Sequence, residues 1–148
     1  MNIEIDLSGR IEVLNTNTVF AFTDGIKRAI LIPARVKRRA SQRLEARGVK
    51  SKMISIRMFA GGLYLLIKPS LNELNLITID REFEGWENEI RSLLLSRIRK
   101  TRTNFNSDNI RFESVGKQAE CHHLALATFR KVKPHDSKVS LLEFLNVC

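Results

Sequence analysis

The sequence predicts an α/β fold with three layers, in which a five-stranded mixed sheet lies between helices. The first 32 residues hold three short apolar or β-branched segments separated by turn residues, and from Pro33 onward helical and strand-like patterns alternate. The chain has 148 residues and is 43% apolar, which suits one buried core. We therefore expect a single domain over residues 1–148, with a core at about 1–132 and a C-terminal tail helix within 137–148.

The opening segments are typical of an antiparallel meander of three strands. Residues 3–7 alternate between apolar and acidic side chains and end at a glycine-containing turn, which predicts the first strand. Residues 11–13 are a candidate continuation beyond that turn. Residues 18–22 predict the second strand, because the Asp24-Gly25 pair that follows favours a hairpin. Residues 29–32 then predict the returning strand.

A helix is predicted after the meander, over residues 34–47. Pro33 suits its start, because the N–H that proline lacks has no partner in a first helical turn. Gly48 suits its C-terminal cap. A thin apolar stripe recurs at every fourth position, at Val36, Ala40 and Leu44. The rest of this helix surface is basic.

Residues 53–67 are almost continuously apolar and contain Gly61-Gly62 in their middle. Periodicity cannot distinguish a buried helix from a pair of strands in such a segment. We interpret it as a buried helix. An alternative is that it forms an interface between two copies of the chain, which leaves a homodimer open.

The remaining segments alternate between strand and helix. Residues 74–79 are short and apolar, as in a central strand buried on both faces, and residues 110–115 predict a further strand. Helical patterns cover residues 84–100 and 118–131, and a short helix follows at 140–145. Right-handed crossovers would place the two later strands parallel to the first.

Composition excludes several classes of protein. Cys121 and Cys148 are the only cysteines, too few for a disulfide framework, and they have no zinc-binding spacing. The first residues lack the pattern of a signal peptide. The longest apolar stretch is interrupted by Ser55 and Arg57 and is shorter than a membrane span. We therefore expect an intracellular, cytoplasmic protein with no membrane partner.

The charge predicts a polyanionic partner. The formal net charge is +9, and the segment from Arg35 to Lys52 contains eight basic residues and only one acid, Glu45. Basic residues of the first helix have no acid four positions away, so an external phosphate explains them better than a solvated face does. We predict that the nucleic-acid contacts, to DNA or RNA, are Arg35, Lys37, Arg38, Arg39, Arg43 and Lys117.

Acidic residues follow the predicted strands at the points where the strands end. Asp6 ends the first strand, Asp80 and Glu82 follow the strand at 74–79, and the last large helix begins with Glu120, His122 and His123. The carboxyl ends of parallel strands meet at one edge of a sheet, and carboxylate oxygens are preferred ligands of Mg²⁺. We predict that Asp6, Asp80 and Glu82 bind Mg²⁺ or Mn²⁺ and act in catalysis with His122, which would assist by coordination or proton transfer.

Each of these residues also has a purely structural interpretation. Asp6 would then hydrogen-bond to the amides of the following turn. Asp80 and Glu82 would be acids at the start of a helix, where the helix dipole favours them. His122 and His123 would be ordinary helix residues.

The order of elements over residues 1–132 resembles the ribonuclease H-like superfamily, which includes ribonuclease H, Holliday-junction resolvases and transposases. Residues 3–9 (Ile-Glu-Ile-Asp-Leu-Ser-Gly) look like the first-strand motif of that family, and residues 76–82 look like its fourth strand, which ends in an acid. Residues 112–125 are similar to the fifth strand and final helix. The resemblance implies that Asp6 and either Asp80 or Glu82 are metal ligands. It places His122 where the family usually has an aspartate and some members have a histidine, and Glu45 where ribonuclease H has an acid.

The leading hypothesis is therefore a metal-dependent nuclease or resolvase-like protein that acts on nucleic-acid phosphodiesters. The final helix has no aspartate, which favours an alternative: a non-catalytic DNA- or RNA-binding module on the same scaffold. A third hypothesis is a protein-interaction domain whose basic helix docks on an acidic partner. The sequence does not choose between DNA and RNA or define a sequence preference.

Overall fold

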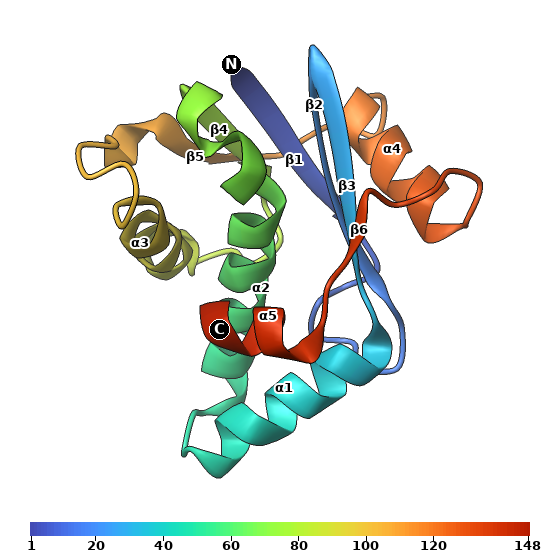
Figure 1. The fold of residues 1–148 in the computed structure, drawn as a ribbon, viewed down its shortest axis with the longest axis vertical. Coiled ribbons are helices and arrows are strands. Elements are labelled where there is room, and N and C mark those ends of the chain that lie inside the picture. The colour runs from blue at the N-terminus through green and yellow to red at the C-terminus, as the bar shows by residue number, and fades with distance from the viewer.

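A computed structural model describes all 148 residues and shows an α/β fold built on a mixed six-stranded sheet (Figure 1). The strand order is β5-β4-β1-β2-β3-β6. The strands are β1 (Asn2–Ser8), β2 (Thr18–Asp24), β3 (Ile26–Ile32), β4 (Leu76–Asp80), β5 (Ile110–Glu113) and β6 (Ser137–Lys138). The α/β prediction is confirmed, but the count of five strands is wrong, because the short β6 pairs with β3 at the edge.

The pairing directions agree with the predicted meander and crossovers. β1 pairs antiparallel with β2, and β2 pairs antiparallel with β3 around the turn at Gly25. β4 is parallel to β1, and β5 is parallel to β4. The candidate strand at residues 11–13 is wrong, since this segment forms turns between β1 and β2.

Helices cover both faces of the sheet (Figure 1). They are α1 (Ala34–Ala46), α2 (Ser51–Ile67), α3 (Glu87–Ile98), α4 (Glu120–Phe129) and α5 (Leu141–Val147), with short 3₁₀ helices at Lys68–Glu73 and Ser107–Asn109. α4 packs on β1 and β2 from one side. α2 lies on the other side, and α1, α3 and α5 pack around it. None of these helices combines the length and the apolar character needed to cross a membrane.

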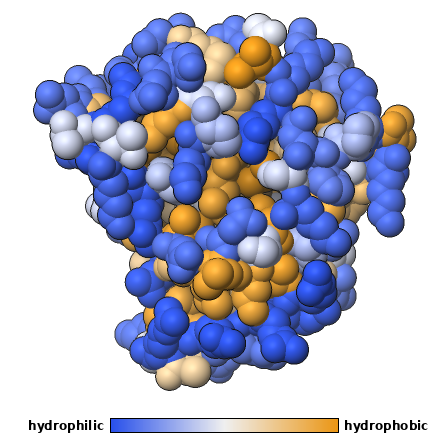
Figure 2. Space-filling model, viewed as in Figure 1, coloured by the Kyte–Doolittle hydropathy of each residue, from blue (hydrophilic) through white to orange (hydrophobic).

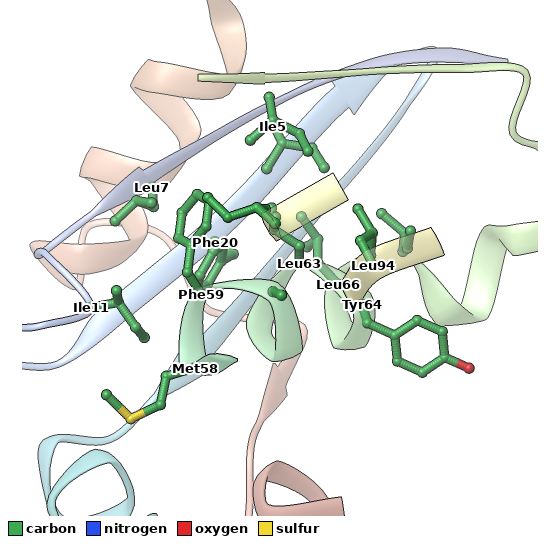
Figure 3. Packing of buried hydrophobic residues seen from close by; sticks show 14 of the residues in the cluster. Ile5, Leu7, Ile11, Phe20, Met58, Phe59, Leu63, Tyr64, Leu66 and Leu94 are labelled. Carbon is green, nitrogen blue, oxygen red and sulfur yellow. The ribbon is translucent and has the colours of Figure 1, made fainter. Parts of the chain in front are cut away.

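The apolar stretch that the sequence left ambiguous is the buried helix α2. Its residues form much of the core between the sheet and the other helices, so the alternative of an interface between copies is wrong (Figure 3). Gly61 and Gly62 serve close packing. A Cβ on Gly62 would clash with the Phe20 ring, and one on Gly61 would lie 3.0 Å from Cys148 Sγ.

Apolar side chains reach the surface mainly in the middle of the molecule in this view, and hydrophilic residues surround them (Figure 2).

Within the sheet, alternation along β1 determines which side chains reach the core. Ile3, Ile5 and Leu7 are buried with the residues of α2, and Ile5 and Leu7 point toward that helix (Figure 3). Asp6 lies on the opposite face, because successive side chains of a strand point to opposite sides. This face is the one that α4 covers.

Candidate functional site

The parallel pairing of β1 and β4 places two carboxylates side by side. Ile5 pairs with Ile79, so the next residue of each strand, Asp6 and Asp80, lies at the same level. Glu82 follows two residues later. One carboxylate oxygen from each of these three residues lies within 4.8 Å of the others. The predicted convergence of Asp6, Asp80 and Glu82 is therefore found, and we call these three residues the acidic cluster.

Hydrogen bonds fix two members of the acidic cluster. Asp6 is only 4% exposed, and its Oδ1 accepts from the Leu7 N–H at 2.7 Å. Its Oδ2 lies 2.8 Å from Nδ1 of His122 on α4. Asp80 Oδ1 accepts from the Val115 N–H, just beyond β5, at 2.8 Å. Two strands, a loop and a helix thus hold the cluster in place.

The acidic cluster lacks compensating charge. None of its carboxylates pairs with a lysine or arginine, and its only basic partner is His122. Burial is the main cause that raises the pKa of Asp6, and it outweighs the hydrogen bonds from His122 and Leu7 that lower this pKa. Burial and then the charge of Asp80 raise the pKa of Glu82 to about 7. A bound cation would relieve both effects.

The donor set fits a hard divalent cation. Three carboxylates supply only oxygen ligands, as Mg²⁺ and Mn²⁺ prefer, and water completes such a shell. Opposite ligands of Mg²⁺ are separated by about 4.2 Å, twice the usual metal–oxygen distance. The cluster, with its oxygens within 4.8 Å of one another, needs only a small contraction to reach this spacing.

The metal-free protein should lose stability as the pH rises from about 4.5 to about 7. Glu82 has an ordinary pKa of 4.5 and a folded pKa of about 7, so the folded state binds more protons in that interval. Glu82→Gln removes this effect. In urea unfolding with a chelator, the variant should be more stable than the wild type at pH 8 and close to it at pH 4.5. An equal difference at both pH values would contradict the assignment.

The start of α4 contributes one side chain to the cluster, where the sequence offered three. His122 contacts Asp6, but Glu120 pairs with Lys27 at 3.8 Å, and both Glu120 and His123 line a different cavity. Successive residues of a helix point about 100° apart, so neighbours cannot all reach one point. Cys121 is buried against the sheet side of α4.

Sequence reasoning missed one acid, Glu12. It lies in the turns between β1 and β2 and lines a cavity of about 530 Å³ together with Glu82. Its charge adds to the causes that raise the pKa of Glu82. No pattern in the sequence indicated this, because the segment looked like a strand. Glu45 is exposed on α1 and does not belong to the acidic cluster.

The basic residues predicted on α1 are exposed, with one exception. The exposed arginines, none of which has an acidic partner, are Arg35, Arg38, Arg39 and Arg43. The prediction for Lys37 is wrong: its side chain is completely buried. Its ammonium donates to Arg10 O, Val13 O and Thr18 Oγ1 at 3.1, 2.6 and 2.9 Å.

Two further basic segments have different surroundings. Lys117 is exposed in the loop between β5 and α4, two residues after the Val115 N–H that contacts Asp80. Arg99 and Arg102 instead hold the backbone together, because Arg99 donates to Phe105 O and Arg102 donates to Leu71 O and Leu74 O. These hydrogen bonds give both arginines a structural role.

No family model, no curated protein and no solved structure matches this chain. A function must therefore be argued from the side chains themselves.

Proposed function

We propose that the protein is a metal-dependent nuclease that cleaves nucleic-acid phosphodiesters at the acidic cluster. The observation that carries the proposal is that Asp6 on β1 meets Asp80 and Glu82, more than 70 residues later in the chain, within 4.8 Å. A strongly basic chain that gathers three carboxylates without a lysine or arginine partner pays an electrostatic penalty. A divalent cation at this point offsets that penalty and attracts a phosphate.

The side chains have distinct roles in this proposal. Asp6, Asp80 and Glu82 would hold Mg²⁺ or Mn²⁺, which when bound neutralises charge on the phosphate and lowers the pKa of water. His122 is a positioning residue, since its Nδ1 contacts Asp6 Oδ2 at 2.8 Å. If Nδ1 carries the proton, Asp6 is held in one orientation and Nε2 is free to accept a proton.

The relation to the ribonuclease H-like superfamily remains part of this proposal. It is supported by a three-stranded meander followed by two strands parallel to the first. It is also supported by acids at the ends of β1 and β4, and by His122 on the helix that follows β5. The departure is at that helix, which supplies a histidine and no aspartate to the cluster.

The direct test is incubation of the purified protein with single-stranded, duplex and branched DNA and RNA, with Mg²⁺, Mn²⁺ or a chelator. We expect cleavage of at least one substrate that depends on the metal and stops with the chelator. Absence of cleavage of every substrate at both metals would overturn the nuclease assignment.

A specific observation favours the alternative of a binding module without catalysis. Both Asp6 oxygens have hydrogen-bond partners within the protein, Leu7 N–H and His122, so a metal is not required to satisfy this carboxylate. The two proposals differ in Asp6→Asn. Nucleic-acid binding survives this substitution in both, but only the enzyme loses an activity.

The exposed face of α1 should bind phosphates in either proposal. Arg35, Arg39 and Arg43 are four residues apart and share one helix face. Replacing all three with Gln should weaken binding and lower the slope of log K against log salt by about 2 to 3. The control replaces the same three arginines with Lys and should keep most of the salt dependence of binding. Equal slopes for the wild type and the Gln variant would contradict this role.

A further inference from the structure

A second basic surface lies at the far end of α4, in the loop Arg130–His135, which we call the basic loop. Hydrogen bonds fix its shape. Lys131 adopts a left-handed conformation (φ 62°) that ends the helix, and the N–H groups of Val132 and Lys133 donate to Ala127 O at 2.9 and 3.2 Å. Asp136 then anchors the loop to β3, since its N–H donates to Ala29 O and its Oδ2 accepts from Ala29 N–H.

The basic loop carries cations that the protein does not neutralise. Arg130, Lys131 and Lys133 are exposed, and none forms an ion pair. Arg130 and Lys133 line a cavity of about 410 Å³ together with Lys27 and His123. Glu120 is the only acid in that lining. A fixed loop that gathers like charges in this way suits a polyanion that compensates them.

A second cavity, also of about 410 Å³, lies on the other side of Lys133. It is lined by Lys131, Lys133 and His135 from the basic loop and by Asn17. Asn17 Oδ1 accepts from the N–H of Ala34, the first residue of α1. The basic loop is therefore close to the start of the arginine-bearing helix, although the two segments are far apart in the sequence.

The distance between the basic loop and the acidic cluster sets the minimum length of a ligand that contacts both. His122, which contacts Asp6, and Arg130 are eight positions apart on α4, about 12 Å along the helix axis. This length equals the rise of three to four base pairs at about 3.4 Å each. A single nucleotide is too short to reach both places, whereas a polynucleotide reaches them easily.

We propose that the basic loop binds the phosphate backbone of the nucleic acid beyond the segment at the acidic cluster. The substrate is then a polynucleotide several nucleotides long, held without base readout. This proposal rests on the proposed function for the identity of the polyanion, but it does not require cleavage. An anionic lipid surface is disfavoured, because Val132 is the only large apolar side chain that the basic loop exposes.

The test compares Arg130→Gln/Lys133→Gln with the charge-matched control Lys68→Gln/Lys100→Gln, whose lysines are exposed elsewhere. Binding of a labelled duplex of about 20 base pairs is measured at several salt concentrations in the Asp6→Asn background, with a chelator present so that no cleavage takes place. We expect the loop variant to bind about tenfold more weakly than the control, with a salt slope smaller by about 2. A far-ultraviolet circular dichroism spectrum and a urea unfolding midpoint equal to those of the wild type show that the loop variant is folded.

The outcomes separate this inference from the proposed function. Cleavage by the wild type, with equal duplex binding by the loop and control variants, overturns the inference and leaves the nuclease intact. Weakened binding in the loop variant without any cleavage by the wild type supports the inference and removes the nuclease. A wild type that binds no nucleic acid overturns both. A loop variant that loses binding to phosphatidylserine vesicles but binds the duplex as the control does overturns the inference alone.

Discussion

Asp6→Asn should lower metal-dependent cleavage by at least about 100-fold, the scale seen when one group that stabilises charge in a transition state is removed. The asparagine keeps the shape of the side chain and can still accept from Leu7 N–H, so the fold should persist. Removing one of three adjacent carboxylates also relieves repulsion within the acidic cluster. This relief offsets the weakened contact with His122 Nδ1, so we expect little change in thermal stability together with the loss of activity.

The matched control is Asp24→Asn, which removes the same charge from an exposed carboxylate at the end of β2. Its Oδ2 accepts from Asn2 N–H, and an asparagine oxygen can take that role. Single-turnover cleavage rates of the two variants separate a local effect from a loss of net negative charge. Similar rates for both variants would show that Asp6 has no part in the chemistry.

Lys37→Met should destabilise the protein by about 2–4 kcal/mol, the largest effect on stability that we expect from a single charged residue. The Lys37 ammonium is buried and donates to Arg10 O, Val13 O and Thr18 Oγ1. Methionine fills a similar volume but leaves these acceptors without their donor. The turns between β1 and β2, which carry Glu12 beside the acidic cluster, would lose their attachment to α1.

Urea unfolding of the wild type, Lys37→Met and the exposed control Lys50→Met measures this effect. The control should lie within about 0.5 kcal/mol of the wild type. Burial lowers the pKa of Lys37 from 10.5 to about 8. The folded state then binds fewer protons between these two values, so the advantage of the wild type over Lys37→Met should grow as the pH rises from about 8 to 10.5. A Lys37→Met variant as stable as the control would refute the structural role.

Much of the fold was predictable because local patterns and tertiary environment agree. Alternation in β1, the Asp24-Gly25 turn and the stripe of α1 each indicated the element that is found. α2 was ambiguous for a physical reason: a helix surrounded by protein has no polar face. The sequence also could not show that the missing side chains of Gly61 and Gly62 leave room for Cys148 and Phe20 to pack against α2. β6 has only two residues, too few for any periodicity.

The positions of site residues were predictable where the register of paired strands determines them. They were not predictable where they depend on tertiary contacts of a single side chain. Asp6 and Asp80 follow paired residues of parallel strands, so their proximity follows from topology. Lys37 belongs to a basic run, and nothing in that run distinguishes a buried lysine from exposed arginines. Its burial depends on carbonyls of the turns between β1 and β2, which only the folded chain brings near.

The central claim is that the acidic cluster binds a divalent cation, and Mn²⁺ titration followed by electron paramagnetic resonance tests it most directly. The free Mn²⁺ signal reports bound metal without any substrate. We predict saturable binding by the wild type, strong weakening in Asp6→Asn and Asp80→Asn, and unchanged binding in Asp24→Asn. Wild-type binding that is absent, or that is equal in the Asp6 and Asp80 variants, would contradict the account.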